Sequence, residues 1–188
     1  MPSRPALRRG MSRAARRLRR LFLACAVLAT LAGAGPAFAA PRLDRFRLTF
    51  DGLGPVHVGM TRGQVRAAGF RVPLGRGQDA NACAQVAVDS DRHVRLMFEE
   101  GRVTRVEVLG GPTPTWSGIR VGAIEEQVRK TYGARLTVRP HKYDPHGHTM
   151  IVFSRDKQRA LVLDTDGQVV KEFRAGLAAS AQYVEGCS

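Results

Sequence analysis

Acidic residues, aromatic residues and cysteines are all scarce in this chain of 188 residues. Aromatic residues make up 6% of the sequence, and 16 acids stand against 30 lysines and arginines. No serine lies in a Gly-x-Ser-x-Gly context, so the sequence does not indicate a serine hydrolase. The Asp-x-Asp-Gly run at 164–167 lacks the spacing and the closing Glu of a calcium loop, so it indicates a tight turn. We therefore expect a protein without catalytic activity and without a cofactor.

The first 39 residues have the three parts of a bacterial signal peptide. A basic stretch over 1–20 precedes an apolar run over 21–35, and that run is shorter than the roughly 20 residues of a permanent transmembrane helix. Ala37 and Ala39 are small residues at the positions that a signal peptidase reads, which predicts cleavage after Ala39. The Arg-Arg pair at 19–20 is typical of twin-arginine export, and general secretion is an equal alternative. The sequence predicts a periplasmic or secreted protein with no permanent membrane anchor.

Removal of this leader changes the charge of the chain. The leader holds eight of the arginines and none of the acids, so the net charge falls from +14 to about +6. The remaining basic residues are scattered singly, with little aromatic residue between them, and we expect no nucleic-acid binding.

Cys83 and Cys187 are the cysteines that remain after the predicted cleavage. An even number of cysteines in an oxidising compartment predicts one disulfide, which would join the end of the chain to its middle. Such a bond closes a loop of about 105 residues, worth on the order of 4 to 5 kcal/mol in the chain-entropy description. The alternative is a pair of unlinked, buried thiols.

Two stretches of the mature chain resemble each other at a spacing of about 65 residues. Residues 56–66 align with 119–129, where Gly, Gln, Val and Arg coincide, and the agreement returns further along the chain. A helix is expected in each stretch. The first begins at a capping box formed by Thr61 and Gln64 and ends at Gly69. The second carries acids in its first turn and bases in its last, and it ends at Gly133.

The rest of each unit has the pattern of antiparallel strands joined by tight turns. The expected strands cover 94–98, 102–108, 149–153, 159–163 and 168–173. The predicted fold class is therefore α+β, with two tandem repeats of a helix plus antiparallel strands packed as one domain. We assign the signal peptide to 1–39, the first repeat to 40–111 and the second repeat to 112–188.

The motif G-M-T-R-x-Q-V at 59–65 resembles the opening of the repeat in the β-lactamase inhibitory protein family, which are secreted tandem-repeat inhibitors. The same G-M-T-x-x-x-V opening is similar to that of the small lipoprotein of the outer-membrane β-barrel assembly machine. Both families are non-catalytic binding proteins. The resemblance therefore implies a protein-binding scaffold.

The loop over 140–148 holds three of the five histidines and is the main concentration of possible metal ligands. His146 and His148 are two residues apart, and His141 could return across the turn to complete a zinc-binding set. Two other interpretations compete with this one. The loop is either a polar connection whose imidazoles bond solvent or nearby backbone, or a partner-contacting loop with Tyr143 as its aromatic anchor. We expect no metal.

Trp116, the single tryptophan, stands just ahead of the second expected helix, where it either packs between the units or serves as an exposed binding anchor. The candidate partner contacts are Trp116, His141, Tyr143, His146 and His148. The expected function is an exported, non-catalytic protein-binding module, such as an inhibitor of a hydrolase, whose partner is another envelope or extracellular protein. The alternatives are an envelope-assembly accessory factor and, with less support, a metal-binding protein that uses residues 141–148.

Overall fold

The computed structural model describes residues 45–73, 82–88 and 91–187. They belong to one compact unit, Ala40–Ser188. The predicted leader and its cleavage site lie outside the described residues.

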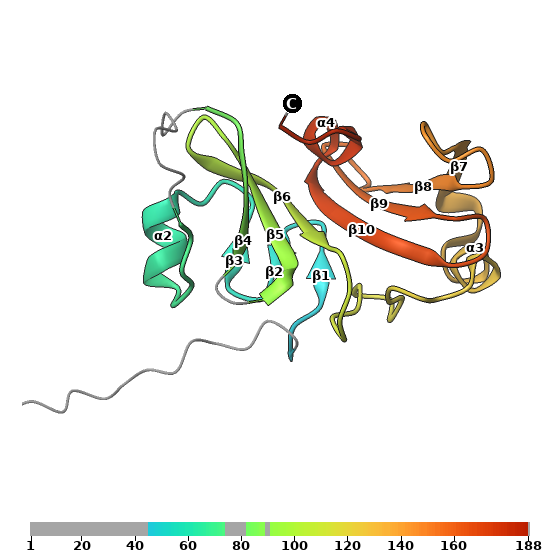
Figure 1. The fold of residues 1–188 in the computed structure, drawn as a ribbon, viewed down its shortest axis with the longest axis horizontal. Coiled ribbons are helices and arrows are strands. Elements are labelled where there is room, and N and C mark those ends of the chain that lie inside the picture. The colour runs from blue at the N-terminus through green and yellow to red at the C-terminus, as the bar shows by residue number, and fades with distance from the viewer. Residues whose placement is uncertain (1–44, 74–81, 89–90, 188) are drawn as a thin grey trace, which may run out of the picture. The chain divides into compact units, whose positions relative to one another are not determined.

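Antiparallel sheet makes up most of the described fold. The short strands near its start are β1 Leu48–Thr49, β2 Gly52–Leu53 and β3 Val56–His57. The later strands are β4 Ala84–Val88, β5 Asp91–Glu99, β6 Arg102–Val108, β7 Leu136–Pro140, β8 His148–Phe153, β9 Arg159–Thr165 and β10 Val170–Leu177. The short strands form a sheet in the order β1-β2-β3, and the others form a seven-stranded sheet in the order β4-β5-β6-β10-β9-β8-β7 (Figure 1).

Three short α-helices accompany the sheets in the described part of the chain. They are α2 Arg62–Ala67, α3 Glu125–Tyr132 and α4 Ala178–Gln182, and a 3-10 turn, η2 Gly133–Arg135, follows α3. The predicted capping box is present at the start of α2, where Thr61 N donates to Gln64 Oε1 at 2.8 Å and Gln64 N donates to Thr61 Oγ1 at 3.3 Å. The expected ends of the first two helices are also confirmed, since α2 stops just before Gly69 and α3 is capped by Gly133.

The predicted α+β class is wrong, because the structure is β-rich. The helices are only 6, 8 and 5 residues long, whereas the large sheet runs through seven strands. Strands from both expected units share that sheet, since β6 pairs with β10 and places Arg174 opposite Glu107. In two separate repeats, the facing edges of β6 and β10 would have unpaired backbone N–H and C=O groups. Pairing β6 with β10 satisfies these groups. The molecule is therefore not a pair of helix-plus-strand repeats.

The turns before α2 and α3 are anchored to the large sheet in the same way. Gly59 N donates to Val103 O of β6 at 2.7 Å, and Gly122 N donates to Val170 O of β10 at 2.8 Å. The similar sequences before the two helices thus correspond to similar local contacts, while the sheet that receives them is continuous.

The apolar core lies on one face of the seven-stranded sheet. Alternate residues of each strand point to this face, as Val106 and Leu163 do, and both are fully buried. The short sheet, α2 and α3 cover it through Leu53, Val65 and Val128. Full burial of an aliphatic side chain of this size stabilises a fold by about 1.5 to 3 kcal/mol, so this face supplies most of the driving force for folding.

The opposite face carries charged side chains, α4 and the end of the chain. Arg105 and Glu107 flank the core residue Val106 in sequence, and alternation along the strand therefore places both on this face. Helix α4 contacts β6, β9 and β10 here, on the other side of the sheet from α3 (Figure 1). A small apolar cluster joins α4 to the sheet and consists of Ile151, Ala160, Val162 and Ala181.

Candidate functional site

A row of polar side chains crosses the sheet face that lies opposite the core. Strand register places Glu107 of β6 between Arg95 of β5 and Arg174 of β10, and the row continues across β9, β8 and β7. We call this row the polar belt. It consists of Arg95, Arg105, Glu107, Arg139, Thr149, Asp164, Glu172 and Arg174.

Buried salt bridges hold the centre of the polar belt. Arg105 pairs with Glu107, Arg174 pairs with Asp164, and all four side chains are at least nine-tenths buried. Glu172 lies 3.4 Å from Arg174 Nη1 and is 42% exposed. Removal of one partner from such a buried pair leaves an uncompensated charge and costs about 3 to 5 kcal/mol. The centre of the belt is therefore sensitive to the loss of any one of these four buried charges.

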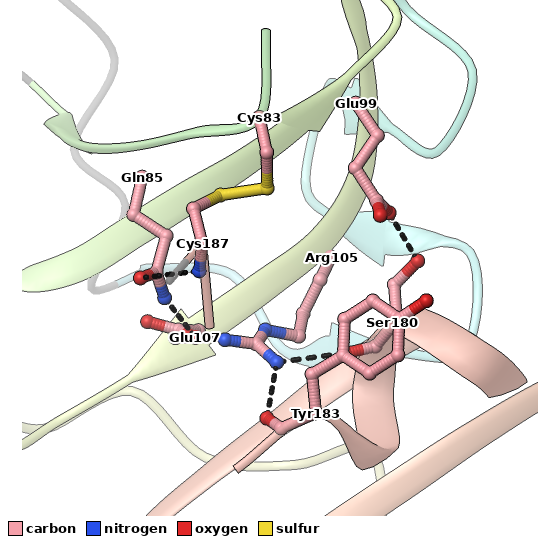
Figure 2. Close-up of a disulfide and its surroundings, with 8 residues drawn as sticks. All are labelled: Cys83, Gln85, Glu99, Arg105, Glu107, Ser180, Tyr183 and Cys187. Atoms are coloured by element: carbon pink, nitrogen blue, oxygen red, sulfur yellow. Dashed lines mark hydrogen bonds and ion pairs between the residues drawn. A yellow bond between two sulfur atoms is a disulfide. The ribbon is translucent and has the colours of Figure 1, made fainter. Parts of the chain in front are cut away.

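The two buried arginines also dock the end of α4. Arg105 Nη1 donates to the carbonyl oxygens of Ser180 at 2.7 Å and Tyr183 at 2.8 Å (Figure 2). Arg174 Nε donates to Ala181 O at 2.7 Å. The last carbonyls of a helix lack partners within the helix and carry the negative end of its dipole, so guanidinium groups are well suited to bind them.

Beyond α4 the chain runs on as a segment, residues 183–187, that we call the strap. The strap ends at Cys187, whose disulfide to Cys83 joins it to the residue before β4, with the two Cα atoms 5.4 Å apart (Figure 2). The predicted cysteine pair is thus joined. Gln85 adds a second link, because its Oε1 accepts from Cys187 N at 3.4 Å and its Nε2 donates to Glu107 Oε1 at 2.8 Å.

Glu185 fastens the middle of the strap to the loop over 140–148. Its carboxylate accepts hydrogen bonds from Lys142 Nζ and Tyr143 Oη. These two hydrogen bonds lower the pKa of Glu185 to about 2, and the bond to Glu185 raises the pKa of Lys142. Both side chains of the ion pair are about half exposed, so solvent screens the attraction. We call the contacts of Glu185 with Lys142 and Tyr143 the clasp. The clasp positions the strap more than it stabilises the fold.

Three cavities lie beside the strap, and Val184 lines all of them. Their volumes are about 330, 220 and 140 Å³. The largest is also lined by Tyr143 and Glu172, the second by Arg95 and Glu172, and the third by Arg139. The strap therefore separates spaces that all open onto the polar belt.

Glu172 stands between the two larger cavities. Burial raises the pKa of its carboxyl group, the negative charges of Asp164 and Glu107 raise it further, and the positive charge of Arg174 opposes them. A carboxyl group that is held in a cleft with a raised pKa is a candidate for contact with a ligand or partner.

The structure gives the three histidines of the 140–148 loop separate surroundings. His141 Nδ1 accepts hydrogen bonds from two backbone N–H groups of its own loop, at 3.0 and 3.3 Å. His148 Nδ1 lies 2.7 Å from Glu125 Oε1, and His146 is exposed. Across the ranges that the structure describes, no three or more His, Cys, Asp or Glu side chains are grouped so that they could hold a metal ion. The predicted alternative of a zinc-binding loop therefore has no structural support.

Glu125, in the first turn of α3, ties this loop to the helix. Burial alone would raise its pKa, but hydrogen bonds from Thr165, His148 and Arg129 lower it overall. The carboxylate thus stays ionised at neutral pH and holds His148 in place.

The other candidate contacts lie on different sides of the sheet. Trp116 packs against the core side, with its ring centroid 4.5 Å from that of Phe50 and 5.9 Å from that of Tyr132. His141 and Tyr143 instead line the largest cavity beside the strap. The structure favours the packing interpretation for Trp116 and leaves Tyr143 as an exposed aromatic residue of the site.

Sequence reasoning missed the polar belt, although a signal was present. Charged and apolar residues alternate in Arg105-Val106-Glu107 and again in Glu172-Phe173-Arg174. Such alternation is typical of a strand with one solvated face. The pattern alone cannot distinguish a solvated face from a row of buried ion pairs.

No protein-family model and no curated protein matches this chain. Among solved structures, the uncharacterized protein yfeY from Escherichia coli is similar over 69% of this chain and 99% of its own, with a TM-score of 0.42 and 11% identity. An extracellular protein containing an SCP domain from Bacillus anthracis str. Ames is similar over 65% of this chain and 39% of its own, with a TM-score of 0.30 and 12% identity. Likenesses this low carry no argument about function. None of the described helices is long and apolar enough to cross a membrane.

Proposed function

We propose that this protein is an exported, non-catalytic binding module for another envelope or extracellular protein, and that the polar face around the strap is its contact surface. The observation that carries the proposal is the exposed rim of this face. Tyr143 and Tyr183 are 62% and 45% exposed there, and Arg95 and Arg139 are exposed at the two ends of the polar belt. Tyrosine and arginine are among the residue types that are enriched at the energetic hot spots of protein interfaces.

The disulfide supports the export part of this proposal, because disulfides persist in oxidising compartments such as the periplasm and the extracellular medium. The predicted signal peptide points the same way. The resemblance at 59–65 to secreted inhibitors makes a hydrolase one of the partner classes that we would test first.

The contacts of the polar belt favour binding over catalysis. Arg105, Glu107, Asp164 and Arg174 are buried and engaged in ion pairs, and both arginines also hold α4. Groups with these structural roles are not free to exchange protons with a substrate. The exposed residues around them are instead placed to contact a protein surface.

A charge-reversal experiment tests the contact surface. The mature chain is immobilised, incubated with periplasmic extract, and the retained proteins are identified by mass spectrometry. The double variant Arg95→Glu with Arg139→Glu should lose the partner. The matched control is Lys130→Glu with Arg135→Glu, which changes the net charge by the same amount at exposed positions in and just after α3. It should keep the partner. Equal retention by both variants would show that the polar face is not the contact surface, and no retained protein in any arm would contradict the binding function.

A further inference from the structure

The strap covers part of the polar belt, and its contacts there indicate what else this face can bind. We propose that the groove beneath residues 183–187 is a binding site for an acidic, extended segment of the partner protein, and that the strap is its intramolecular occupant. This inference rests on the proposed binding function and names the partner's chemistry.

The geometry of the cavities defines the groove. Val184 is the wall that the cavities of about 330, 220 and 140 Å³ share. Displacement of the strap would therefore join them into one channel across the sheet. Arg95 lines it over β5, and Arg139 lines it over β7. A channel that crosses the strands of a sheet in this way fits an extended chain better than a compact ligand.

The strap shows which groups the groove accepts. Arg105 binds the main-chain carbonyl of Tyr183 at 2.8 Å, and Lys142 and Tyr143 bind the carboxylate of Glu185. Both kinds of group, a main-chain carbonyl and a side-chain carboxylate, are present in any acidic peptide. Charge-assisted hydrogen bonds of these types are stronger than bonds between neutral groups.

The charge of the groove without the strap is positive. Among the described residues that line the three cavities, six are cationic and four, apart from Glu185 of the strap, are acidic. The cationic residues are Arg95, Arg105, Arg139, Lys142, Lys171 and Arg174. The acidic residues are Glu107, Asp144, Asp164 and Glu172. An excess of positive charge in a cleft attracts acidic segments and disfavours basic ones.

Several cationic groups of the groove have donors that the strap does not use. Arg95 and Arg139 form no ion pair with any described residue. Arg105 Nε and Arg174 Nη2 are buried and donate to no described acceptor. The groove therefore keeps binding capacity that the strap leaves unfilled, and a longer acidic segment can use it.

The test measures peptide binding with and without the strap. The probe is a fluorescein-labelled decapeptide of glutamate, and labelled decapeptides of glutamine and lysine are the composition controls. Fluorescence anisotropy compares the oxidised mature chain with the Cys187→Ser variant and with a chain that ends at Gln182. Freeing or removing the strap should tighten binding of the glutamate peptide by about tenfold or more, because the oxidised chain keeps its groove mostly occupied.

Specificity is tested in the chain that ends at Gln182. The pair Arg95→Gln with Arg139→Gln should weaken binding of the glutamate peptide, while Lys130→Gln with Arg135→Gln should leave it unchanged. A cooperative melting curve checks the fold of each variant. If the shortened chain does not fold, the Cys187→Ser variant and the dithiothreitol-reduced wild type decide the result.

Two results would overturn the proposal. Equal affinity of the oxidised and strap-free chains for the glutamate peptide would show that the strap does not occupy the site. Equal binding of the glutamine peptide would show that acidity is not recognised. A partner that is retained in the pull-down despite either result would leave the binding function standing and remove this inference alone.

Discussion

The two faces of the seven-stranded sheet are built from the same strands by opposite chemistry. On β6, Val106 points into the apolar core, while its neighbours Arg105 and Glu107 form a buried ion pair on the other face. Both faces are largely closed to solvent at the centre of the sheet. Packed aliphatic side chains exclude solvent from one face, whereas guanidinium–carboxylate contacts exclude it from the other.

The two faces therefore have different roles: the apolar face stabilises the fold, and the polar face positions α4 and the strap. Apolar burial is non-directional and scales with area, so the core face stabilises the fold without specifying one arrangement in detail. A buried ion pair contributes little net stability compared with apolar residues of the same volume, but it is strongly destabilising when one partner is lost. The polar face thus determines where α4 and the strap lie.

The largest effect is expected at Arg174. Arg174→Met should destabilise the protein by about 3 to 5 kcal/mol, because Asp164 is left buried without its partner and Ala181 O loses its donor. The double variant Arg174→Met with Asp164→Leu should recover much of this loss. Urea unfolding of both variants measures it. A double variant no more stable than the single one would contradict the comparison of the two faces.

On the core face, Leu161→Ala should destabilise the protein by about 2 to 5 kcal/mol, because the side chain is fully buried in the apolar cluster and its removal leaves a cavity. A second truncation, Val106→Ala, should add to the loss instead of relieving it. The same urea titrations give the result. Rescue by the second truncation would mean that the core face also depends on specific pairs.

The contribution of Glu125 to the stability of the protein should depend on pH. Its pKa in the folded protein lies below the ordinary value of 4.5, so its contribution to stability is complete above that pH and is lost as pH falls through the lowered pKa. Glu125→Gln should therefore destabilise the protein at pH 7 and have a smaller effect in acid. Urea unfolding of the two chains between pH 7 and pH 3 tests this. A stability difference independent of pH would exclude the ionised carboxylate as its cause.

The ionised carboxylate of Glu172 should have the opposite effect on stability from that of Glu125. Burial raises its pKa, so the ionised form opposes folding at pH values above that raised pKa. Glu172→Gln should leave the melting temperature at pH 7 unchanged or slightly higher, even though a charge pair with Arg174 is lost. Calorimetry measures the shift. A clear drop in melting temperature would show that the ion pair outweighs the cost of burial.

The smallest effect on stability is expected at Glu185. Its hydrogen bonds hold its pKa at about 2, so the clasp to Lys142 and Tyr143 should persist down to that pH and release below it. Hydrogen exchange of the strap amides should rise in Glu185→Gln while the melting temperature stays nearly constant. Unchanged exchange in the variant would mean that Glu185 does not hold the strap.

Local features of the sequence predicted several elements correctly. The capping box at Thr61 and the glycine at Gly133 marked helix boundaries, because the hydrogen bonds and backbone angles involved lie within a few residues. The β5–β6 hairpin was also expected, and its turn contains Glu100 and Gly101, with φ angles of 50° and 72°. The cysteine pair followed from the two cysteines that remain after the predicted cleavage and from the oxidising compartment that this cleavage implies.

Other elements carried too little pattern to be recognised. The strands β1, β2 and β3 have two residues each, which is too short for any period to show. Helix α4 spans five residues with no capping side chain. Arg174 of the preceding strand and Arg105, which is 75 residues away from Ser180 in sequence, hold its end in place.

The sequence by itself determined the local units of this protein, which are two helix boundaries and the central hairpins. It also predicted one long-range bond, Cys83–Cys187, because these are the two cysteines that remain after the predicted cleavage. Only the tertiary structure decided that β6 and β10 join all seven strands into one sheet. It also decided that alternating charges become a buried belt beneath the strap. The physical reason is that a strand's register and the burial of a charge depend on partners far along the chain, whereas caps and turns depend on their immediate neighbours.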